Sequence, residues 1–373
     1  MAISLFIAGD VVPKGIQPDF FITKSEQIFK EMKPFVTKAD FSIVNLEAPV
    51  VKEKPTPIKK SGPCLSTTPS TVEILKKAGF SIFTLANNHF FDQGQKGVDT
   101  TIDVCNHLNV KVVGGGKTYR QAREPLLLEH EGKCVAIINA CEHEYSIADS
   151  EHGGSNPLDL INMQEDIAHV RGEANYVVLI LHGGKEQYPY PTPRMKRWFR
   201  HFVDLGADVV INHHQHCING YEVYKDKPIF YGLGNFYFPW WPARPESWKY
   251  GYAVWLTLDK KNGFELIPYK QTVEAISLRD QEEFNKEIAL LNLPIADDFL
   301  LQQKFDEKLI EKERDLKSMM LPSFLRGRLF SKLIKRGVFG KLYKRKHVYS
   351  LKNHMTCESH HESLQRLLSI LIK

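Results

Sequence analysis

Short apolar runs alternate with amphipathic segments from Ile3 to about Lys270, which is the pattern of an α/β fold. The apolar runs predict buried strands over residues 4–8, 41–45, 82–85, 111–113, 135–139, 177–181, 209–211 and 228–231. Apolar positions at helical spacing predict helices over residues 24–36, 71–78, 97–108, 162–172 and 192–205. Beyond about Thr272 the pattern becomes helical and highly charged, without strand signals. We therefore expect one domain over residues 1–270 and a charged helical extension over residues 271–373.

Basic and acidic residues are sorted along this extension. The formal net charge of the chain is only +5, yet residues 316–357 hold eleven Lys and Arg and no acidic residue. The preceding residues 279–315 hold eleven acidic residues against six basic ones. A short amphipathic helix in the basic tail is predicted by the spacing of Leu325, Leu329, Phe330, Leu333 and Ile334. Such a helix can lie on an anionic membrane surface, pack back onto the acidic segment, or remain solvated.

The composition is that of an ordinary soluble globular protein. Of the 373 residues, 43% are hydrophobic and 25% are charged, and six cysteines form no CxxC pair. We expect reduced thiols, no membrane-spanning helix and, because no basic leader precedes the first strand, a cytoplasmic protein. If the amphipathic helix lies on a membrane, the basic tail would hold the protein peripherally on the inner membrane face. No nucleic-acid-binding motif accompanies the basic charge, so no nucleic-acid partner is expected.

Polar residues follow six of the predicted strands at the point where each strand ends. Open α/β sheets place ligands at this edge, because the loops after neighbouring strands converge there. Carboxylate, amide and imidazole groups are the protein ligands of Mn, Fe, Zn and Mg ions. The set comprises Asp10, Glu47, Asn88, His89, Asp92, His182, His213, His214, His216 and Asn235. The sequence therefore predicts a metal centre with a neighbouring histidine as proton donor.

Single members of this set also have explanations that need no metal. Asp10 can be a turn former after a strand, His89 can cap a helix, and His182 can be a hydrogen-bonded histidine of the core. The three imidazoles of residues 213–216 differ, because the packing of an apolar strand gives no reason for them. They favour the metal interpretation.

Two further segments are candidates for the walls of a substrate cleft. Residues 236–244 are rich in aromatic side chains and end at Arg244, which together with Lys249 suits an anionic group. The same aromatic residues can instead close the edge of the sheet. The loop of residues 51–66, rich in Lys and Pro, is a candidate for a second wall.

In their order and spacing, these motifs resemble the CapA-type bacterial capsule-synthesis proteins, the poly-γ-glutamate capsule family. The match covers about residues 2–239 and rests on Gly9-Asp10, Asn45-Leu46-Glu47-Ala48-Pro49, Ala86-Asn87-Asn88-His89-Phe90-Phe91-Asp92-Gln93-Gly94, His182-Gly183-Gly184-Lys185-Glu186-Gln187-Tyr188, His213-His214-Gln215-His216 and Gly232-Leu233-Gly234-Asn235-Phe236. That family is similar to the calcineurin-like metallophosphatases. The resemblance implies a four-layer α/β/β/α sandwich with the site at one edge of its two sheets, followed here by a helical C-terminal extension.

The resemblance also implies roles for individual residues. The implied metal ligands are Asp10, Glu47, Asn88, His182, His214 and His216. His89 resembles the general acid, and we place Asp92 beside it in the catalytic group. We predict Glu186, Arg244 and Asn235 to bind substrate. The ligand count supports one or two divalent ions, of Mn, Fe, Zn or Mg.

Three positions depart from the metallophosphatase pattern. Val12 stands where a second, histidine ligand is usual, Glu47 replaces the bridging aspartate, and Asn212 replaces a frequent glycine. A single-metal or inactive site is therefore an alternative to a dinuclear one. Glu186 and Asp92 are near enough in the motifs to substitute or to act indirectly.

Two functions are consistent with these residues. The first is a metal-dependent hydrolase, phosphoesterase- or amidase-like, acting on a phosphoester or on an anionic, polyglutamate-like polymer during capsule or surface-polymer biosynthesis. The alternative is a non-catalytic component that binds the polymer or capsule assembly proteins in a membrane-associated complex. We favour the hydrolase.

Overall fold

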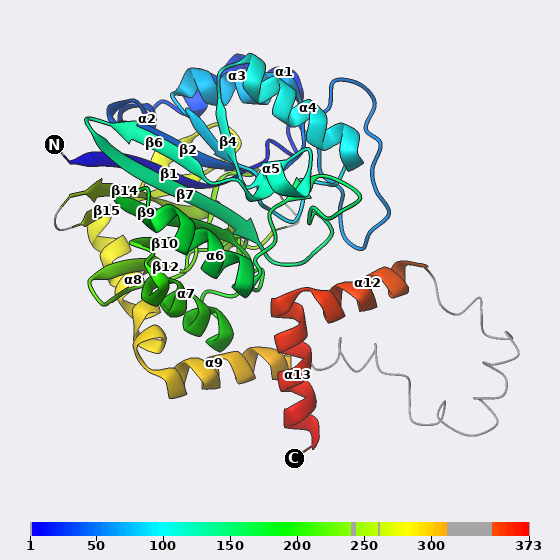
Figure 1. The fold of residues 1–373 in the computed structure, drawn as a ribbon, viewed down its shortest axis with the longest axis vertical. Coiled ribbons are helices and arrows are strands. Elements are labelled where there is room, and N and C mark those ends of the chain that lie inside the picture. The colour runs from blue at the N-terminus through cyan, green and yellow to red at the C-terminus, as the bar shows by residue number, and fades with distance from the viewer. Residues whose placement is uncertain (1, 240–243, 260–261, 312–344, 373) are drawn as a thin grey trace, which may run out of the picture.

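Two β-sheets form the centre of the computed structural model, which describes residues 2–239, 244–259, 262–311 and 345–372 (Figure 1). In the first sheet the strands run in the order β16, β15, β14, β1, β2, β3, β4, and β13 pairs with the end of β1. Their bounds are β1 Ile3–Val11, β2 Phe41–Leu46, β3 Ile82–Thr84, β4 Lys111–Val113, β13 Asn235–Tyr237, β14 Tyr250–Leu258, β15 Gly263–Gln271 and β16 Ile276–Leu278. Strands β1 to β4 are parallel, so their carboxyl ends share one edge.

The second sheet has the order β11, β12, β10, β9, β7, β6. Its strands are β6 Leu126–His130, β7 Lys133–Cys141, β9 Tyr176–His182, β10 Val209–His213, β11 Tyr221–Tyr224 and β12 Lys227–Phe230. Strands β7, β9, β10 and β12 are parallel neighbours, and they too end along one edge. A separate two-stranded ladder pairs β5 (Gly115–Gly116) with β8 (Gly154–Ser155).

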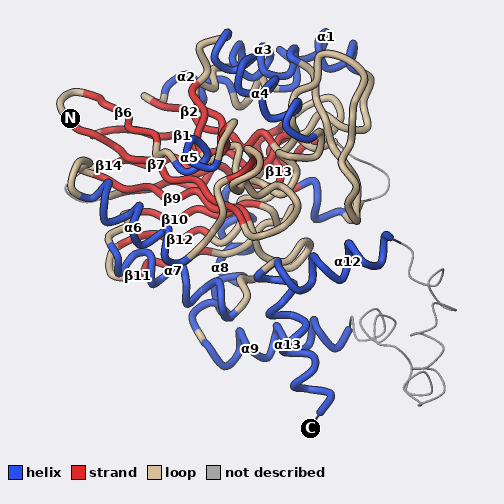
Figure 2. Tube along the Cα trace, turned by 45° about the vertical axis from the view of Figure 1, so that its right-hand side comes forward, coloured by secondary structure: helices blue, strands red, loops and turns tan. Residues whose placement is uncertain are grey.

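Helices lie on the outer face of each sheet (Figure 2). Those over the first sheet are α1 Pro18–Ile28, α2 Lys33–Lys38, α3 Pro69–Ala78 and α4 Gly94–His107. Those over the second sheet are α6 Leu160–Arg171 and α7 Pro193–Leu205. Two short elements, α5 Tyr119–Arg123 and the 3-10 helix η1 Glu246–Lys249, lie in connections.

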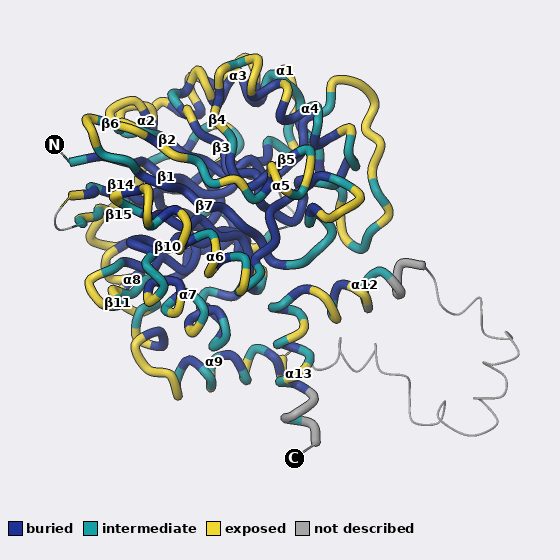
Figure 3. Tube along the Cα trace, viewed as in Figure 1, coloured by how far each residue is buried: buried dark blue, intermediate teal, exposed yellow. Residues whose placement is uncertain are grey.

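Three apolar layers hold this arrangement together. Along β1, Phe6 and Ala8 face the helices, whereas Leu5 and Ile7 face the other sheet, because successive side chains of a strand point to opposite faces. The third layer lies between the second sheet and α6 and α7, where Phe199 is buried. Figure 3 shows the central strands of the two sheets, such as β1, β7 and β10, as buried. The predicted four-layer α/β/β/α sandwich is thus confirmed.

Local differences from the predicted elements have physical reasons. All eight predicted strands are present, but the helix expected over residues 24–36 is divided between α1 and α2. Phe29 leaves the helical conformation after α1, and Pro34 fits the first turn of α2, where no backbone N–H is needed.

The region after β12 holds strands that the apolar pattern did not predict. Strands β14 and β15 form an antiparallel pair, and β16 adds to β15. The expectation of no strand beyond Thr272 is therefore wrong, because a strand of three residues is held by its pairing and shows no periodicity of its own. Phe284 and Ile288, just after it, pack into the layer between the sheets. The domain boundary at residue 270 stays a prediction.

Beyond β16, the described part of the C-terminal extension is helical, as predicted. It consists of α8 Gln281–Ala296, α9 Asp298–Glu311, α12 Arg345–Thr356 and α13 Glu358–Ile372. Leu367 of α13 packs with Phe305 and Leu309 of α9 and with Tyr188. The amphipathic helix predicted for the basic tail lies outside the described residues. Within the described ranges, no helix combines the length and the apolar character needed to cross a membrane.

Candidate metal centre and adjoining cavity

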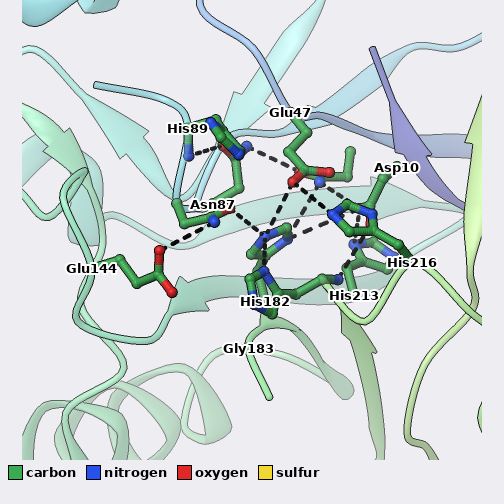
Figure 4. A network of polar contacts seen from close by, with 12 residues as sticks. Asp10, Glu47, Asn87, His89, Glu144, His182, Gly183, His213 and His216 are labelled. Carbon is green, nitrogen blue, oxygen red and sulfur yellow. Dashed lines mark hydrogen bonds and ion pairs between the residues drawn. The ribbon is translucent and has the colours of Figure 1, made fainter. Parts of the chain in front are cut away.

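The polar strand ends of the two sheets meet at one edge of the sandwich (Figure 4). In the first sheet Asp10 pairs in register with Asn45 of β2 and with Asn235 of β13. In the second sheet His182 of β9 lies in register with His213 of β10. Close approach of β1 to the chain before β13 requires Gly9, because a Cβ there would lie 2.0 Å from the carbonyl oxygen of Gly234.

Two buried carboxylates face a group of buried imidazoles across the gap between the sheets. Asp10 Oδ2 lies 3.5 Å from His216 Nδ1, and Asp10 Oδ1 lies 3.9 Å from His213 Nδ1 and 4.0 Å from His182 Nδ1. Glu47 Oε1 lies 3.6 Å from His216 Nε2 and 3.8 Å from His182 Nε2. Such separations exceed those of hydrogen bonds. They suit donor atoms that surround a shared cation at about 2.0–2.2 Å.

Glu47 carries the strongest indication of a cation. Its side chain is fully buried, and neither carboxylate oxygen has a hydrogen-bond partner. Burial, and then the nearby charge of Asp10, raise the pKa of Glu47 well above its ordinary value. Burial also raises the pKa of Asp10 to about 6, although Asn45 donates a hydrogen bond to it at 2.7 Å. A divalent ion would remove the cost of keeping these carboxylates charged.

Burial favours the neutral form, which binds metals, in His182, His213 and His216. Burial, followed by the neighbouring imidazoles, lowers the pKa of His182 well below its usual range. Burial lowers the pKa of His213 and of His216 to about 3. His182 Nε2 lies 3.1 Å from both His214 Nδ1 and Asn88 Oδ1. The donor set of neutral imidazole, amide and carboxylate groups therefore fits a divalent ion.

The backbone at the closing histidines is strained in a way that turns their rings inward. His214 and His216 have φ angles of 93° and 54°, in the left-handed region that favours glycine. Between them, the Gln215 amide donates a hydrogen bond to Tyr231 O at 2.8 Å and accepts one from Asn212 at 2.9 Å. Backbone strain of this kind, about 1–3 kcal/mol for each residue, is concentrated at functional sites.

All six residues predicted as metal ligands gather at this edge of the sandwich. The structure also brings His213 to this edge. His213 belongs to the strand-end set predicted above but not to the six ligands implied by the resemblance, and its ring nitrogens are buried without a hydrogen-bond partner. Val12 packs among apolar side chains that include Phe238 and Trp248, so this position offers no ligand. Asn45 was also missed, because its place inside an apolar strand shows nothing of its contact with Asp10.

His89 and Asp92 form a pair beside the metal centre. Asp92 Oδ2 lies 2.5 Å from His89 Nδ1 and accepts a hydrogen bond from the backbone of Leu65 at 2.6 Å. Lys60 forms an ion pair with Asp92 and lies 3.2 Å from His89 Nδ1. Burial and the charge of Lys60 lower the pKa of His89, against the opposing effect of Asp92. The pair therefore orients the ring so that Nε2 is the nitrogen left for a ligand.

A cavity of about 340 Å³ adjoins the metal centre, and both predicted walls contribute to it. The loop of residues 51–66 supplies Lys60 to Pro63, and the aromatic stretch supplies Phe238 and Arg244. Arg244 lies over the ring of Trp248, 4.5 Å from its centroid. Glu186, predicted to bind substrate, also lines the cavity. Trp240 to Ala243 lie outside the described residues.

Asn235 has a different position from that of Arg244 and Glu186. It is fully buried, its Oδ1 lies 2.8 Å from His216 Nδ1, and its Nδ2 donates to Trp248 O at 3.1 Å. The contact that the structure shows is thus with a candidate metal ligand. A contact of Asn235 with substrate stays a prediction.

The family model described as "Bacterial capsule synthesis protein PGA_cap" matches residues 4–239. The capsule biosynthesis protein CapA of Bacillus anthracis is 31% identical over 222 residues, which cover 57% of this chain and 54% of that protein. The PGA biosynthesis protein CapA of Bacillus subtilis is 29% identical over 251 residues, or 65% of each chain. A probable polyglutamine synthesis accessory protein of Mycobacterium tuberculosis is 26% identical over 213 residues, covering 53% of this chain and 56% of that protein. The chain thus spans between about half and two thirds of these relatives.

Solved structures with a similar arrangement include a phosphatase from Mycoplasma pneumoniae, with a TM-score of 0.48 and 16% identity, covering 78% of this chain and 99% of that one. A putative 5'-nucleotidase from Staphylococcus aureus has a TM-score of 0.42 and 14% identity, covering 78% of this chain and 58% of that one. The fold of this chain is therefore defined by its own sheets and helices, as described above, and not by these similarities.

Proposed function

The chain belongs to the PGA_cap family of bacterial capsule synthesis proteins, and from this premise we propose that it is a metal-dependent hydrolase of capsule or surface-polymer biosynthesis. Its proposed substrates are phosphoesters or the amide bonds of a polyglutamate-like polymer. The names of the Bacillus and Mycobacterium relatives refer to the biosynthesis of a capsule, of PGA and of polyglutamine, and they support a role in the synthesis of such a polymer.

The observation that carries the proposal is the environment of Glu47. A buried carboxylate without a hydrogen-bond partner is costly unless a cation neutralises it. Asp10, which faces the same imidazoles, is also buried with a raised pKa, although it accepts a hydrogen bond from Asn45. Without a cation, Glu47 would be buried either as an unpaired charge or, after protonation, as a carboxyl group whose oxygens have no hydrogen-bond partner.

The proposed ligands are Asp10, Glu47, Asn88, His182, His214 and His216, with His213 beside them. They would hold one or two divalent ions. When bound, such an ion supplies Lewis acidity and lowers the pKa of water. Asn235 keeps the ring of His216 in place through Nδ1, which leaves Nε2 directed towards Glu47.

The remaining residues would bind the substrate and donate a proton to the leaving group. Lys60 and Arg244 give the cavity positive charge for an anionic substrate. Asp92 holds Nδ1 of His89, so that Nε2 can give a proton to the leaving group. A bound anion would counter the effect of Lys60 on the pKa of His89 and favour the protonated imidazole.

Hydrolysis assays with the full chain test the proposal. We would supply Mn²⁺ and compare p-nitrophenyl phosphate, bis-p-nitrophenyl phosphate and poly-γ-glutamate as substrates. The wild type should hydrolyse one of them, and the His214→Ala/His216→Ala variant should lose at least about 100-fold of that rate. His107→Ala, at an exposed position of α4, is the matched control and should be unchanged. No hydrolysis by the metal-loaded wild type, or full activity of the double variant, would contradict the proposal.

A further inference from the structure

The cavity beside the metal centre has a wall that comes from the far C-terminal part of the chain. Ser350, Asn353 and His354 of α12 and His360 of α13 line it together with His89 and Arg244. In Figure 1, α12 extends beside the loops at the end of the sandwich where the strands of the site terminate. The family match ends at residue 239, so these helices lie outside it.

Helix α13 is attached to the sandwich mainly through contacts with Glu142. This carboxylate is buried, forms an ion pair with Arg194, and accepts hydrogen bonds from Gly184 N at 3.2 Å and Ser359 Oγ at 2.8 Å. Ser359 N donates to the same carboxylate at 3.3 Å. Burial opposes ionisation, but Arg194 and these donors leave the pKa of Glu142 below its ordinary value. Without α13, a buried carboxylate would lose two of its donors.

Further contacts tie both helices to the sandwich. Glu362 accepts hydrogen bonds from Thr192 Oγ1 at 2.6 Å and from the backbone of Arg194 at 3.0 Å. Glu358 accepts one from the backbone of His143 at 2.8 Å. Tyr145, itself a lining residue of the cavity, donates to the carbonyl of Tyr349 at 2.9 Å. Contacts at both helices therefore fix the wall in one place.

The histidines of this wall have defined hydrogen-bonding roles. His354 Nδ1 donates to Ser350 O at 2.8 Å, so in the neutral ring Nε2 is the nitrogen with the lone pair. His360 Nδ1 accepts from the Asn353 amide at 3.0 Å, which places the proton of the neutral ring on Nε2. The two rings stack with their centroids 5.1 Å apart. Both imidazoles can thus present an N–H to an anion, His360 directly and His354 when protonated.

We propose that α12 and α13 belong to the substrate site, where His354 and His360 bind an anionic group of the ligand, a phosphate or a carboxylate. Lys60 and Arg244 line the same cavity, as do the carboxylates Glu144, 3.8 Å from His360 Nδ1, and Glu186, so the anion would bind on the side of the cations. The inference rests on the proposed function, which supplies the reacting centre next to this cavity. At about 340 Å³ the cavity is near the lower end of small-molecule sites. The helical wall therefore selects a short anionic unit, such as one end of a polymer.

Anion binding tests the inference without any need for turnover. We would titrate the Mn²⁺-loaded full chain with inorganic phosphate and, separately, with γ-linked triglutamate in a calorimeter. The His354→Ala/His360→Ala variant should bind the preferred anion about tenfold more weakly, as expected for the loss of charge-assisted hydrogen bonds. Its Mn²⁺ content should equal that of the wild type. His361→Ala, at an exposed neighbouring position of α13, should bind as the wild type does.

The two anions and the two double variants distinguish the possible explanations of a change in binding. Stronger binding of phosphate or of triglutamate identifies which anion the wall recognises. The His354→Gln/His360→Gln variant keeps polar groups of similar size, and its circular dichroism checks that weaker binding is no folding defect. Equal affinity in the wild type and both double variants would overturn the inference, as would the absence of binding of either anion to the wild type. Failure of hydrolysis with histidine-dependent anion binding would contradict the proposed function alone.

Discussion

The metal centre and the C-terminal wall of the cavity are built by different means. The candidate ligands of the metal centre lie at strand ends whose positions follow from two parallel ladders and three apolar layers. The wall consists of helices that are attached through side-chain ion pairs and hydrogen bonds, with Glu142 and Arg194 at the centre. The proposed chemistry therefore depends on residues that the core of the fold holds in place, whereas the proposed selection of the ligand depends on helices attached to that core.

The largest expected effect is a loss of kcat when a residue beside the candidate metal centre is replaced. His89→Ala should lower kcat about 10²- to 10⁴-fold, because it removes the proposed proton donor. The Mn²⁺ content should remain that of the wild type, because His89 is not among the proposed ligands. Steady-state kinetics and elemental analysis of the same preparations measure both quantities. Loss of metal together with activity would show that His89 belongs to the metal centre instead.

Arg194→Ala should separate the wall from the core. The substitution leaves Glu142 and Glu362 without their cationic partner, which costs about 3–5 kcal/mol for a buried pair. We expect α13 to detach and the buried Cys357 thiol to react with a disulfide reagent more than tenfold faster, as followed by mass spectrometry. Metal binding should persist. Arg197→Ala, an exposed position on the same helix, is the control; unchanged labelling of Arg194→Ala would contradict the attachment that we describe.

Glu47→Gln should stabilise the metal-free protein, but it should weaken the stabilisation that bound Mn²⁺ provides. Removal of an unpaired buried charge should raise the Tm of the metal-free protein by about 1–2 °C, for about 1 kcal/mol in a chain of 373 residues. The same substitution should reduce the Tm gain upon addition of Mn²⁺. Because the pKa of Glu47 is raised, its carboxylate destabilises the metal-free fold more as pH rises, so the gain should be larger at pH 8 than at pH 5.

The exposed Glu265→Gln should show neither effect on Tm. If metal-free Glu47→Gln had a lower Tm than the metal-free wild type at pH 8, Glu47 would not be an unpaired buried charge, and the account of its role would be contradicted.

The smallest expected effect is a pH dependence of the wall. His143 lies against Glu358 of α13, with Asp159 and Glu142 nearby, and the hydrogen bond to Glu358 raises the pKa of His143. Its contribution to docking is complete below the ordinary pKa of histidine and is lost as pH rises through the raised value. The ratio of Cys357 labelling rates between His143→Gln and the wild type should therefore fall towards one between pH 6 and pH 8.5. A constant ratio would contradict this.

The sequence predicted the core side of the molecule well, for reasons that the residues make clear. Apolar runs such as residues 177–181 predicted strands that the structure shows, and the polar residues after them, such as His182, predicted the cluster at the strand ends. The role of these residues as metal ligands stays a prediction. The wall could not be predicted in this way, because Ser359 and Glu362 meet Glu142 and Arg194 only through long-range folding. Nor does any pattern show that Asn45 contacts Asp10 or that His213 faces it.

Metal content tests the central claim most directly. The wild type, His107→Ala and His214→Ala/His216→Ala would be incubated with Mn²⁺, desalted and analysed for bound metal per chain. The account predicts about one or two ions in the wild type and in His107→Ala, and loss of metal in the double variant. A wild type that binds no divalent ion after reconstitution, or a double variant that keeps its metal, would contradict the account.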